Sequence, residues 1–330
     1  MLAYFLRRFF YMLLLLFLLS IVSFTIIQLP PGDFMTYYLQ ALAMRGSTPS
    51  ESELENLTRQ YGLDRPAYQQ YFRWSRRALQ GDFGRSFDWR KPVSELLEER
   101  LLLTVIMNIT AMVLIYIIAI PVGIYSATHQ YSFGDYSFTV IGFIGLATPG
   151  FLLALVLMVV FYNLFGLSVS GLFSAEYVNA PWSLGRLFDL FKHLPVPVII
   201  IAAAGTASLI RVMRNCLLDE FRKQYVITAR AKGVSERRLL FRYPVRVAIN
   251  PIISTIGWML PATISGGTIT AMVLSLPTIG PILFRALRNQ DMYLAGTIVM
   301  LLGFLTVVGT FISDLLLAWV DPRIHYEKKS

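Results

Sequence analysis

Long apolar stretches without charged residues are the feature that most constrains how this chain can fold. Of its 330 residues, 55% are hydrophobic and only 15% are charged, whereas a soluble domain has roughly 45–50% apolar and about 25% charged residues. The excess is concentrated in stretches that reach the roughly 20 residues a helix needs to cross a membrane. We therefore expect an all-α integral membrane protein, and the composition excludes a disordered chain, a fibrous protein and an ordinary soluble enzyme.

Six stretches are long enough to span a membrane, and we expect each to form one transmembrane helix. They cover residues 9–29, 101–128, 136–165, 194–210, 249–276 and 293–320. The first is longer than the roughly 7–15 apolar residues of a signal-peptide core, so we expect it to be retained. The resulting divisions are an N-terminus with the first span (1–29), a segment between spans one and two (30–100), a five-span core (101–320) and a tail (321–330).

The distribution of basic residues predicts the orientation of these spans. The net charge is +9, and segment 211–246 alone holds ten Lys and Arg residues against three acids. Residues 30–100 are balanced, with ten bases and ten acids. Because Lys and Arg accumulate on the cytoplasmic side of membrane spans, we expect segment 211–246 and both termini to be cytoplasmic.

The segment between the first two spans has the features of a folded extracytoplasmic piece rather than a linker. A capping-box pattern with Pro at the first helical position occurs at Thr48–Glu51, and Gly62 is a candidate helix stop. A second helix is expected from about Pro66 until shortly before Gly81, where a turn-forming Gly-Asp-Phe-Gly run begins. The aromatic residues of that helix either pack a small cap on the membrane surface or contact a partner protein.

Segment 215–248 predicts two short amphipathic helices joined by a glycine hinge. Gly233 is a candidate terminator of the first helix, and Ser235 is a candidate N-cap of the second. A nucleic-acid-binding patch is disfavoured in a 34-residue loop between membrane spans. The composition leaves two other uses open: binding to anionic lipid through Lys and Arg, and docking of another protein on small residues such as Ala229 and Ala231.

The run from Tyr225 to Leu240 resembles the coupling loop of ABC importer permeases of the dipeptide/oligopeptide branch. Further matches to that branch are the outer runs 61–66 and 81–86, Asn250-Pro251, and the chain end Asp321-Pro-Arg-Ile324. In that family the loop inserts into a groove on a cytoplasmic ATPase. The resemblance therefore implies that the docking and coupling residues are Tyr225, Thr228, Ala229, Arg230, Ala231, Lys232, Gly233, Ser235 and Glu236.

The resemblance also implies a six-helix permease fold, partner subunits and a location. The expected partners are a second homologous permease subunit, two cytoplasmic ATPase subunits that bind ATP and Mg, and an extracytoplasmic solute-binding protein. The expected location is the cytoplasmic membrane of a bacterium or archaeon. Members of this branch import peptides, and similar permeases import nickel or oligosaccharides, so a peptide is the first expectation for the solute.

Polar and glycine residues in the fifth apolar stretch are candidates for lining a translocation path. They are Thr263, Ser265, Gly266, Thr268 and Thr270. Small polar residues also make helix–helix contacts in membranes, but these outnumber what one packing seam needs. Pro149-Gly150 in the third stretch and Pro261 in the fifth are expected to kink a helix or to permit close packing.

Motifs of catalysis and nucleotide binding are missing from the sequence. No G-x-x-x-x-G-K-[ST] motif occurs, and the three histidines lie far apart without metal-ligand spacing. We expect no catalytic residue, metal or cofactor in this chain, with ATP hydrolysis supplied by partners. An ATP-independent secondary carrier or channel is the rival interpretation, for which the intramembrane Asp314 would be the main candidate for proton coupling. Asp314 lies near the cytoplasmic end of the last span, however, which favours a structural ion pair or a helix-end acid. A membrane-embedded scaffold or receptor is a third class.

Overall fold

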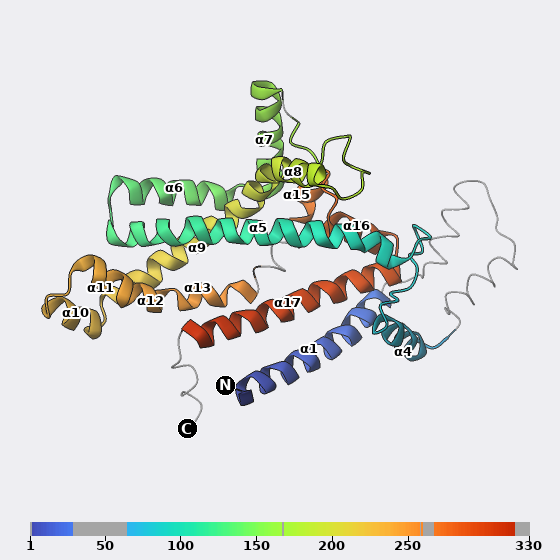
Figure 1. Cartoon of the computed structure of the whole chain (residues 1–330), viewed down its shortest axis with the longest axis horizontal. Coiled ribbons are helices and arrows are strands. Elements are labelled where there is room, and N and C mark those ends of the chain that lie inside the picture. Colours follow the sequence, from blue (N-terminus) through green and yellow to red (C-terminus); the bar gives the residue numbers. More distant parts are fainter. Residues whose placement is uncertain (1, 29–64, 167, 258, 260–266, 321–330) are drawn as a thin grey trace, which may run out of the picture. The chain divides into compact units, whose positions relative to one another are not determined.

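The computed structural model describes residues 2–28, 65–166, 168–257, 259 and 267–320 (Figure 1). Within these ranges the elements are helices, apart from one isolated β-bridge between Arg85 and Pro92. The expected all-α fold is thus confirmed for the described part of the chain. The capping-box pattern at Thr48–Glu51 and the stop at Gly62 lie outside the described residues.

The helices form two compact units, which we describe separately. The smaller unit (Phe5–Leu103 and Thr278–Val307) contains most of α1 (Leu2–Gln28), α4 (Ala67–Ala78), the start of α5 (Val93–Thr128), α16 (Ile279–Arg288) and the start of α17 (Met292–Val320). The larger unit contains the rest of α5 and α17 with α6 (Phe133–Ala147), α7 (Gly150–Phe165), α8 (Leu184–His193), α9 (Pro195–Phe221), α10 (Gln224–Ala231), α11 (Glu236–Arg242), α12 (Pro244–Ala248), α13 (Asn250–Ser254) and α15 (Thr268–Val273).

Four of the described helices are long and apolar enough to cross a membrane. They contain the segments Leu6–Thr25, Val93–Thr128, Pro195–Phe221 and Tyr293–Leu317, which match the first, second, fourth and sixth apolar stretches. A fifth span results if α6 and α7 are counted as one broken helix. The structure therefore confirms a multi-span membrane protein with four or five candidate spans in its described part.

The third apolar stretch differs from the expected single span. It is broken into α6 and α7, whose axes differ by 104° (Figure 1). The residue before a proline is pushed out of the helical region, and Thr148 accordingly has φ −87° and ψ 118°. Pro149 then forms the N-cap of α7. The expected kink at Pro149-Gly150 is a sharp break.

The fifth stretch is also interrupted where the structure describes it. Helix α12 ends and α13 begins around Ile249. Pro251 has no N–H with which to bond the carbonyl four residues back, which explains the interruption. Residues 258 and 260–266 lie outside the described part, so a single continuous span is not seen over 249–276.

In the smaller unit, α4 packs against α1 through aromatic side chains. Trp74 is buried beside Phe24 and Tyr71, and the Tyr71 and Ser20 hydroxyls lie 2.7 Å apart. Tyr68 and Phe72 on the same helix are exposed. The expected helix after Pro66 is confirmed, and its aromatic residues include both a packed set and an exposed set.

The turn that follows α4 is fastened to the start of α17 by Asp291. Gly81 and Gly84 both have positive φ, as a turn there requires. Asp291 is fully buried and accepts hydrogen bonds from the Ser86 hydroxyl and from the backbone N–H groups of Asp88 (3.2 Å) and Leu294 (3.3 Å). An apolar core that includes Val93, Leu97, Ile279, Ile282, Leu294 and Ile298 lies next to this contact.

Candidate functional site: the basic loop and the cavity along α9

The basic loop, residues 222–243, follows α9 and contains α10 and α11 (Figure 1). Gly233 lies between the two helices with φ +76°, a conformation that favours glycine. Its N–H donates to the Arg230 carbonyl at 3.0 Å, and the Val234 N–H donates to the Ala229 carbonyl at 3.3 Å. The expected pair of short helices joined by a glycine hinge is confirmed.

A small core fixes which residues of the basic loop face outwards. Val226, Ala229 and Leu239 are buried together, with Val234 and Tyr243 packed against them. Ala229 therefore lies inside the loop rather than on its surface. The other expected docking residues are all exposed: Tyr225, Thr228, Arg230, Ala231, Lys232, Gly233, Ser235 and Glu236.

One ion pair joins the two helices of the loop. Arg230 donates from Nε and Nη2 to the two carboxylate oxygens of Glu236 at 2.7 and 3.1 Å. The hydrogen bond from Arg230 lowers the pKa of the Glu236 carboxyl. Ser235 occupies the expected N-cap position of α11, but its side chain makes no capping hydrogen bond. The bidentate ion pair instead connects the end of α10 to the start of α11.

Most cations of the basic loop face outwards without an acidic partner among the described residues. Six of their side chains make no hydrogen bond or ion pair with any described residue: Arg222, Lys223, Lys232, Arg237, Arg238 and Arg242. Charges on a protein surface attract a complementary surface. The loop is thus a folded, strongly basic surface suited to an acidic partner.

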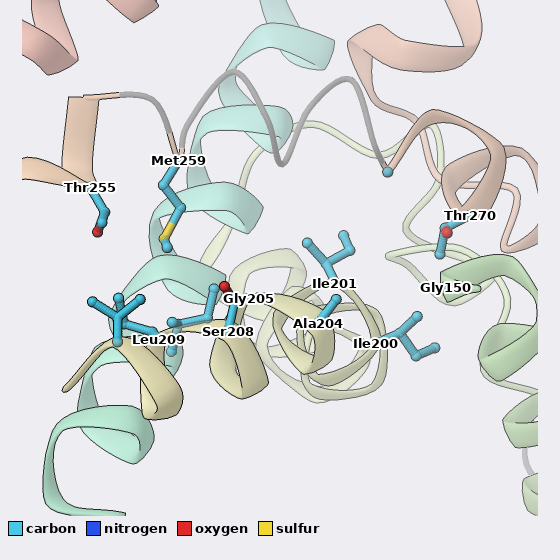
Figure 2. Close-up of a pocket in the computed structure, with 13 residues that line it drawn as sticks. Gly150, Ile200, Ile201, Ala204, Gly205, Ser208, Leu209, Thr255, Met259 and Thr270 are labelled. Atoms are coloured by element: carbon cyan, nitrogen blue, oxygen red, sulfur yellow. The ribbon is translucent and has the colours of Figure 1, made fainter. Parts of the chain in front are cut away.

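A cavity of about 240 Å³ lies along one side of α9 (Figure 2). Figure 2 shows Ile200, Ala204 and Ser208 of α9 along one side of it, with Thr255 and Met259 across from them. The lining is completed by Ile115, Gly150, Ile201, Gly205, Leu209, Val212, Gly267 and Thr270. None of these residues is charged, and the side-chain polar groups are the hydroxyls of Ser208, Thr255 and Thr270. The cavity can therefore pack apolar groups and exchange hydrogen bonds, but offers no ion pair.

The predicted path residues are only partly described. Thr263, Ser265 and Gly266 lie outside the described residues. Thr270 lines the cavity, whereas Thr268 does not. The contribution of α9 was missed by the sequence analysis, although its Ala202–Ser208 run of small residues signals a helix face that other groups can approach closely.

The ion pair between Asp135 and Arg214 was also missed. Arg214 on α9 donates from Nε (3.0 Å) and Nη2 (2.9 Å) to the carboxylate of Asp135, which is buried in the first turn of α6. The Tyr131 N–H also donates to that carboxylate at 3.0 Å. The spacing of Ser132 and Asp135 is that of a helix start, and the Ser132 hydroxyl accepts the Asp135 N–H. That spacing could have placed Asp135 in the first turn of a helix.

Comparison with known proteins agrees with this architecture. Residues 119–326 match the family model described as "Binding-protein-dependent transport system inner membrane component", and residues 1–108 match the model of the N-terminal part of such components. The chain is 36% identical over 327 residues to the oligopeptide transport system permease protein AppB of Bacillus subtilis, with 99% of this chain and 100% of AppB covered.

Two further relatives extend the similarity. The dipeptide transport system permease protein DppB of Alkalihalophilus pseudofirmus is 28% identical over 340 residues, covering 99% of this chain and all of DppB. The inner membrane ABC transporter permease protein YejB of Escherichia coli O157:H7 is 32% identical over 288 residues, covering 83% of this chain and 76% of YejB. This chain belongs to the family of inner membrane components of binding-protein-dependent transport systems.

Proposed function

We propose that this chain is the membrane subunit of an ATP-driven importer and forms half of the translocation pathway for a peptide. The solute would be delivered by an extracytoplasmic binding protein. The observation that carries the proposal is that one chain combines an uncharged cavity with a basic loop. All but one of the seven Lys and Arg residues of that loop lack an acidic partner among the described residues. The relatives named as oligopeptide and dipeptide permeases match this chain over nearly its whole length, which makes a peptide the favoured solute.

The proposed membrane topology has six spans, with both termini and the basic loop in the cytoplasm. The broken helix pair α6–α7 would contribute the third span, and the interrupted segment from α13 to α15 the fifth. Segment 30–100 and the loop containing α8 would then be extracytoplasmic. The concentration of Lys and Arg in segment 211–246 supports this orientation.

The proposed partners follow from the chemistry of the basic loop and from the family. Two ATPase subunits would bind ATP and Mg and present an acidic groove to the loop. The exposed residues Tyr225, Thr228 and Ala231, together with the six cations that have no acidic partner in the described part of the chain, would form the contact. Ala229 would act by holding the loop in shape rather than by contact. A second, homologous permease subunit would supply the other half of the pathway.

The cavity along α9 would be the part of the pathway that this chain contributes. Its hydroxyl groups could exchange hydrogen bonds with peptide N–H and C=O groups while the solute passes. Because the described lining carries no charge, it would not hold a charged side chain of the peptide by an ion pair. A solute moves on only when its binding at each site is weak enough to leave.

Filling the cavity tests this role. Ala204→Phe places a ring into the cavity, whereas Ile199→Phe changes an exposed residue of α9 outside the lining. We expect Ala204→Phe to reduce ATP-driven peptide uptake at least tenfold while the ATPase subunits still co-purify. Ile199→Phe should retain uptake. Equal uptake by the two variants would remove the cavity from the pathway.

A further inference from the structure

Helix α8 buries two charged side chains and exposes an apolar face, although Leu190 is also buried and Lys192 is exposed. Arg186 and Asp189 are only 4% and 9% exposed, whereas Leu184 and Phe188 are 76% and 75% exposed. Phe191 is also exposed, at 59%. This is the reverse of the arrangement expected for a helix that covers a soluble core.

The inward polar side of α8 is fastened by specific contacts. The Ser174 N–H and hydroxyl each donate to the Asp189 carboxylate at 2.6 Å. The Arg186 guanidinium lies 4.5 Å from the ring of Phe173 and 4.8 Å from the ring of Trp182. The helix cannot roll to hide its apolar face without breaking these contacts. The outward direction of that face is therefore a fixed feature of the fold.

The outward face of α8 is an uninterrupted row of apolar residues, and the helix directly precedes a candidate membrane span. Leu184, Leu187, Phe188 and Phe191 follow the i, i+3, i+4, i+7 spacing of one helix face, and none of them is polar. Leu194 both ends α8 and precedes α9, and the apolar span begins at Pro195. The apolar face of α8 thus adjoins a helix that is long and apolar enough to cross a membrane.

We propose that α8 lies in the membrane–water interface, with Leu184, Leu187, Phe188 and Phe191 inserted among lipid acyl chains. Amphipathic helices bind this region through an apolar face that enters the boundary of the headgroups and chains. If a soluble partner covered this face and left after each delivery, the face would be exposed to water again. Large apolar patches are rarely left exposed to water. Lipid covers it throughout. The helix would then fix the depth of α9, whose next turns line the cavity.

Spin labelling of the full-length chain in lipid nanodiscs tests this proposal. Cys216 is the only cysteine, so a Cys216→Ser background accepts single labels. Nitroxides would be attached at Phe188→Cys and, as a control facing water, at Glu176→Cys, because Glu176 is exposed. The readout is the ratio of collisions with oxygen, which concentrates in lipid, to collisions with a water-soluble nickel chelate.

The expected result is an oxygen-to-nickel ratio at residue 188 several times that at residue 176. Equal ratios would place the face in water and overturn the proposal. Low accessibility of residue 188 to both probes would mean that a protein covers it, which also overturns the proposal. If Phe188→Cys fails to fold, Leu184→Cys serves in its place, because this side chain is 76% exposed. The readout does not depend on transport, so its failure leaves the proposed function separately testable.

Discussion

Gly233 carries the hinge of the basic loop in a backbone conformation that other residues adopt at a cost of about 1–2 kcal/mol. A Cβ added there would meet no atom of the chain within 4 Å. Gly166, at the end of α7, has a similar φ of +63° and also has open space. The two glycines therefore differ in location but not in intrinsic strain, which makes Gly166 a matched control.

We predict that Gly233→Val uncouples ATP hydrolysis from uptake, because it both strains the hinge and adds bulk to the proposed docking surface. Gly166→Val should cost similar stability without uncoupling, and Gly233→Asn should retain more coupling because Asn tolerates the left-handed region. The measurement is peptide uptake per ATP hydrolysed. Equal losses in the variants at 233 and 166 would assign the effect to strain alone.

Asp291 offers a second test at the residue scale, through pH. Burial raises the pKa of its carboxyl above the ordinary 3.8. Hydrogen bonds from Ser86 and the Asp88 N–H lower the pKa, but burial has the larger effect. A carboxyl with a raised pKa in the folded state binds a proton more tightly there than in the unfolded chain. Its contribution to stability is thus fully present below the ordinary value and is lost as pH rises through the folded value.

We predict that wild-type protein loses stability relative to Asp291→Asn as pH rises from 4 to 7, because Asn cannot titrate. Thermal unfolding of both proteins in the same detergent measures the difference. Glu176→Gln supplies a control for the same kind of substitution at an exposed position. A wild-type advantage that grows with pH would contradict the prediction.

Ala229 illustrates what the sequence could and could not predict at this scale. The resemblance placed it on a docking surface with its small neighbours, yet it packs with Val226 and Leu239. The three-residue spacing of Val226 and Ala229 already indicated a shared helix face. What the sequence could not provide was the return of α11 over that face, because this depends on the tertiary turn at Gly233.

At the scale of elements, the ion pair of Asp135 and Arg214 joins α6 to α9. Removing one partner of a buried pair typically costs about 3–5 kcal/mol, because the other charge stays buried without compensation. The Asp135 side chain is buried, whereas that of Arg214 is 23% exposed. We therefore predict that Arg214→Gln, which leaves the carboxylate buried without its partner, destabilises by roughly this amount. Asp135→Asn should cost less because Arg214 can reach solvent, and the double variant should cost less than the sum of the two. Unfolding of the four proteins in detergent supplies the cycle. Strict additivity would show that the contact contributes nothing to the pairing of the helices.

The packing of α5 against α9 gives a second prediction for elements. A Cβ on Gly123 would lie 2.6 Å from Met213 Cβ and 3.1 Å from the Ile210 backbone oxygen, whereas one on Gly205 would lie 2.7 Å from Ile115 Cδ1. The end of an isoleucine can rotate away, but a Cβ and a backbone oxygen cannot. We predict that Gly123→Ala destabilises by about 1–3 kcal/mol through overpacking. Gly205→Ala should be near neutral, since alanine also favours a helix. Equal losses in thermal unfolding would contradict this.

Apolar length predicted the existence of the helices far better than their continuity. The first, second, fourth and sixth stretches are single helices because no proline interrupts their middle, except Pro121, which α5 accommodates. The third stretch breaks at Pro149. Sequence identified the proline but not whether α6 and α7 would bend slightly or by 104°. The contacts of α7 with α9 and α15 decide this, and they join residues far apart in the chain.

At the scale of the whole molecule, composition and charge were sufficient to predict a multi-span membrane protein, and the loop sequence was sufficient to place it in its family. The cavity along α9 was not predictable, because its lining comes from five separate parts of the chain, around residues 115, 150, 200–212, 255–259 and 267–270. Apart from the part that contributes Ile115, each part contributes a small or hydroxyl residue to the lining. Such residues, taken alone, fit helix packing equally well.

We propose that this chain imports a peptide only when ATPase subunits act on its basic loop. The most direct test is uptake of a labelled peptide mixture by proteoliposomes that contain the complex purified through this chain, with its extracytoplasmic binding protein added. ATP would be supplied in the compartment that the loop faces. We predict uptake with ATP, and none with a non-hydrolysable analogue or with this chain reconstituted alone. Uptake at full rate by this chain alone, without ATP, would contradict the account and support a secondary carrier or channel.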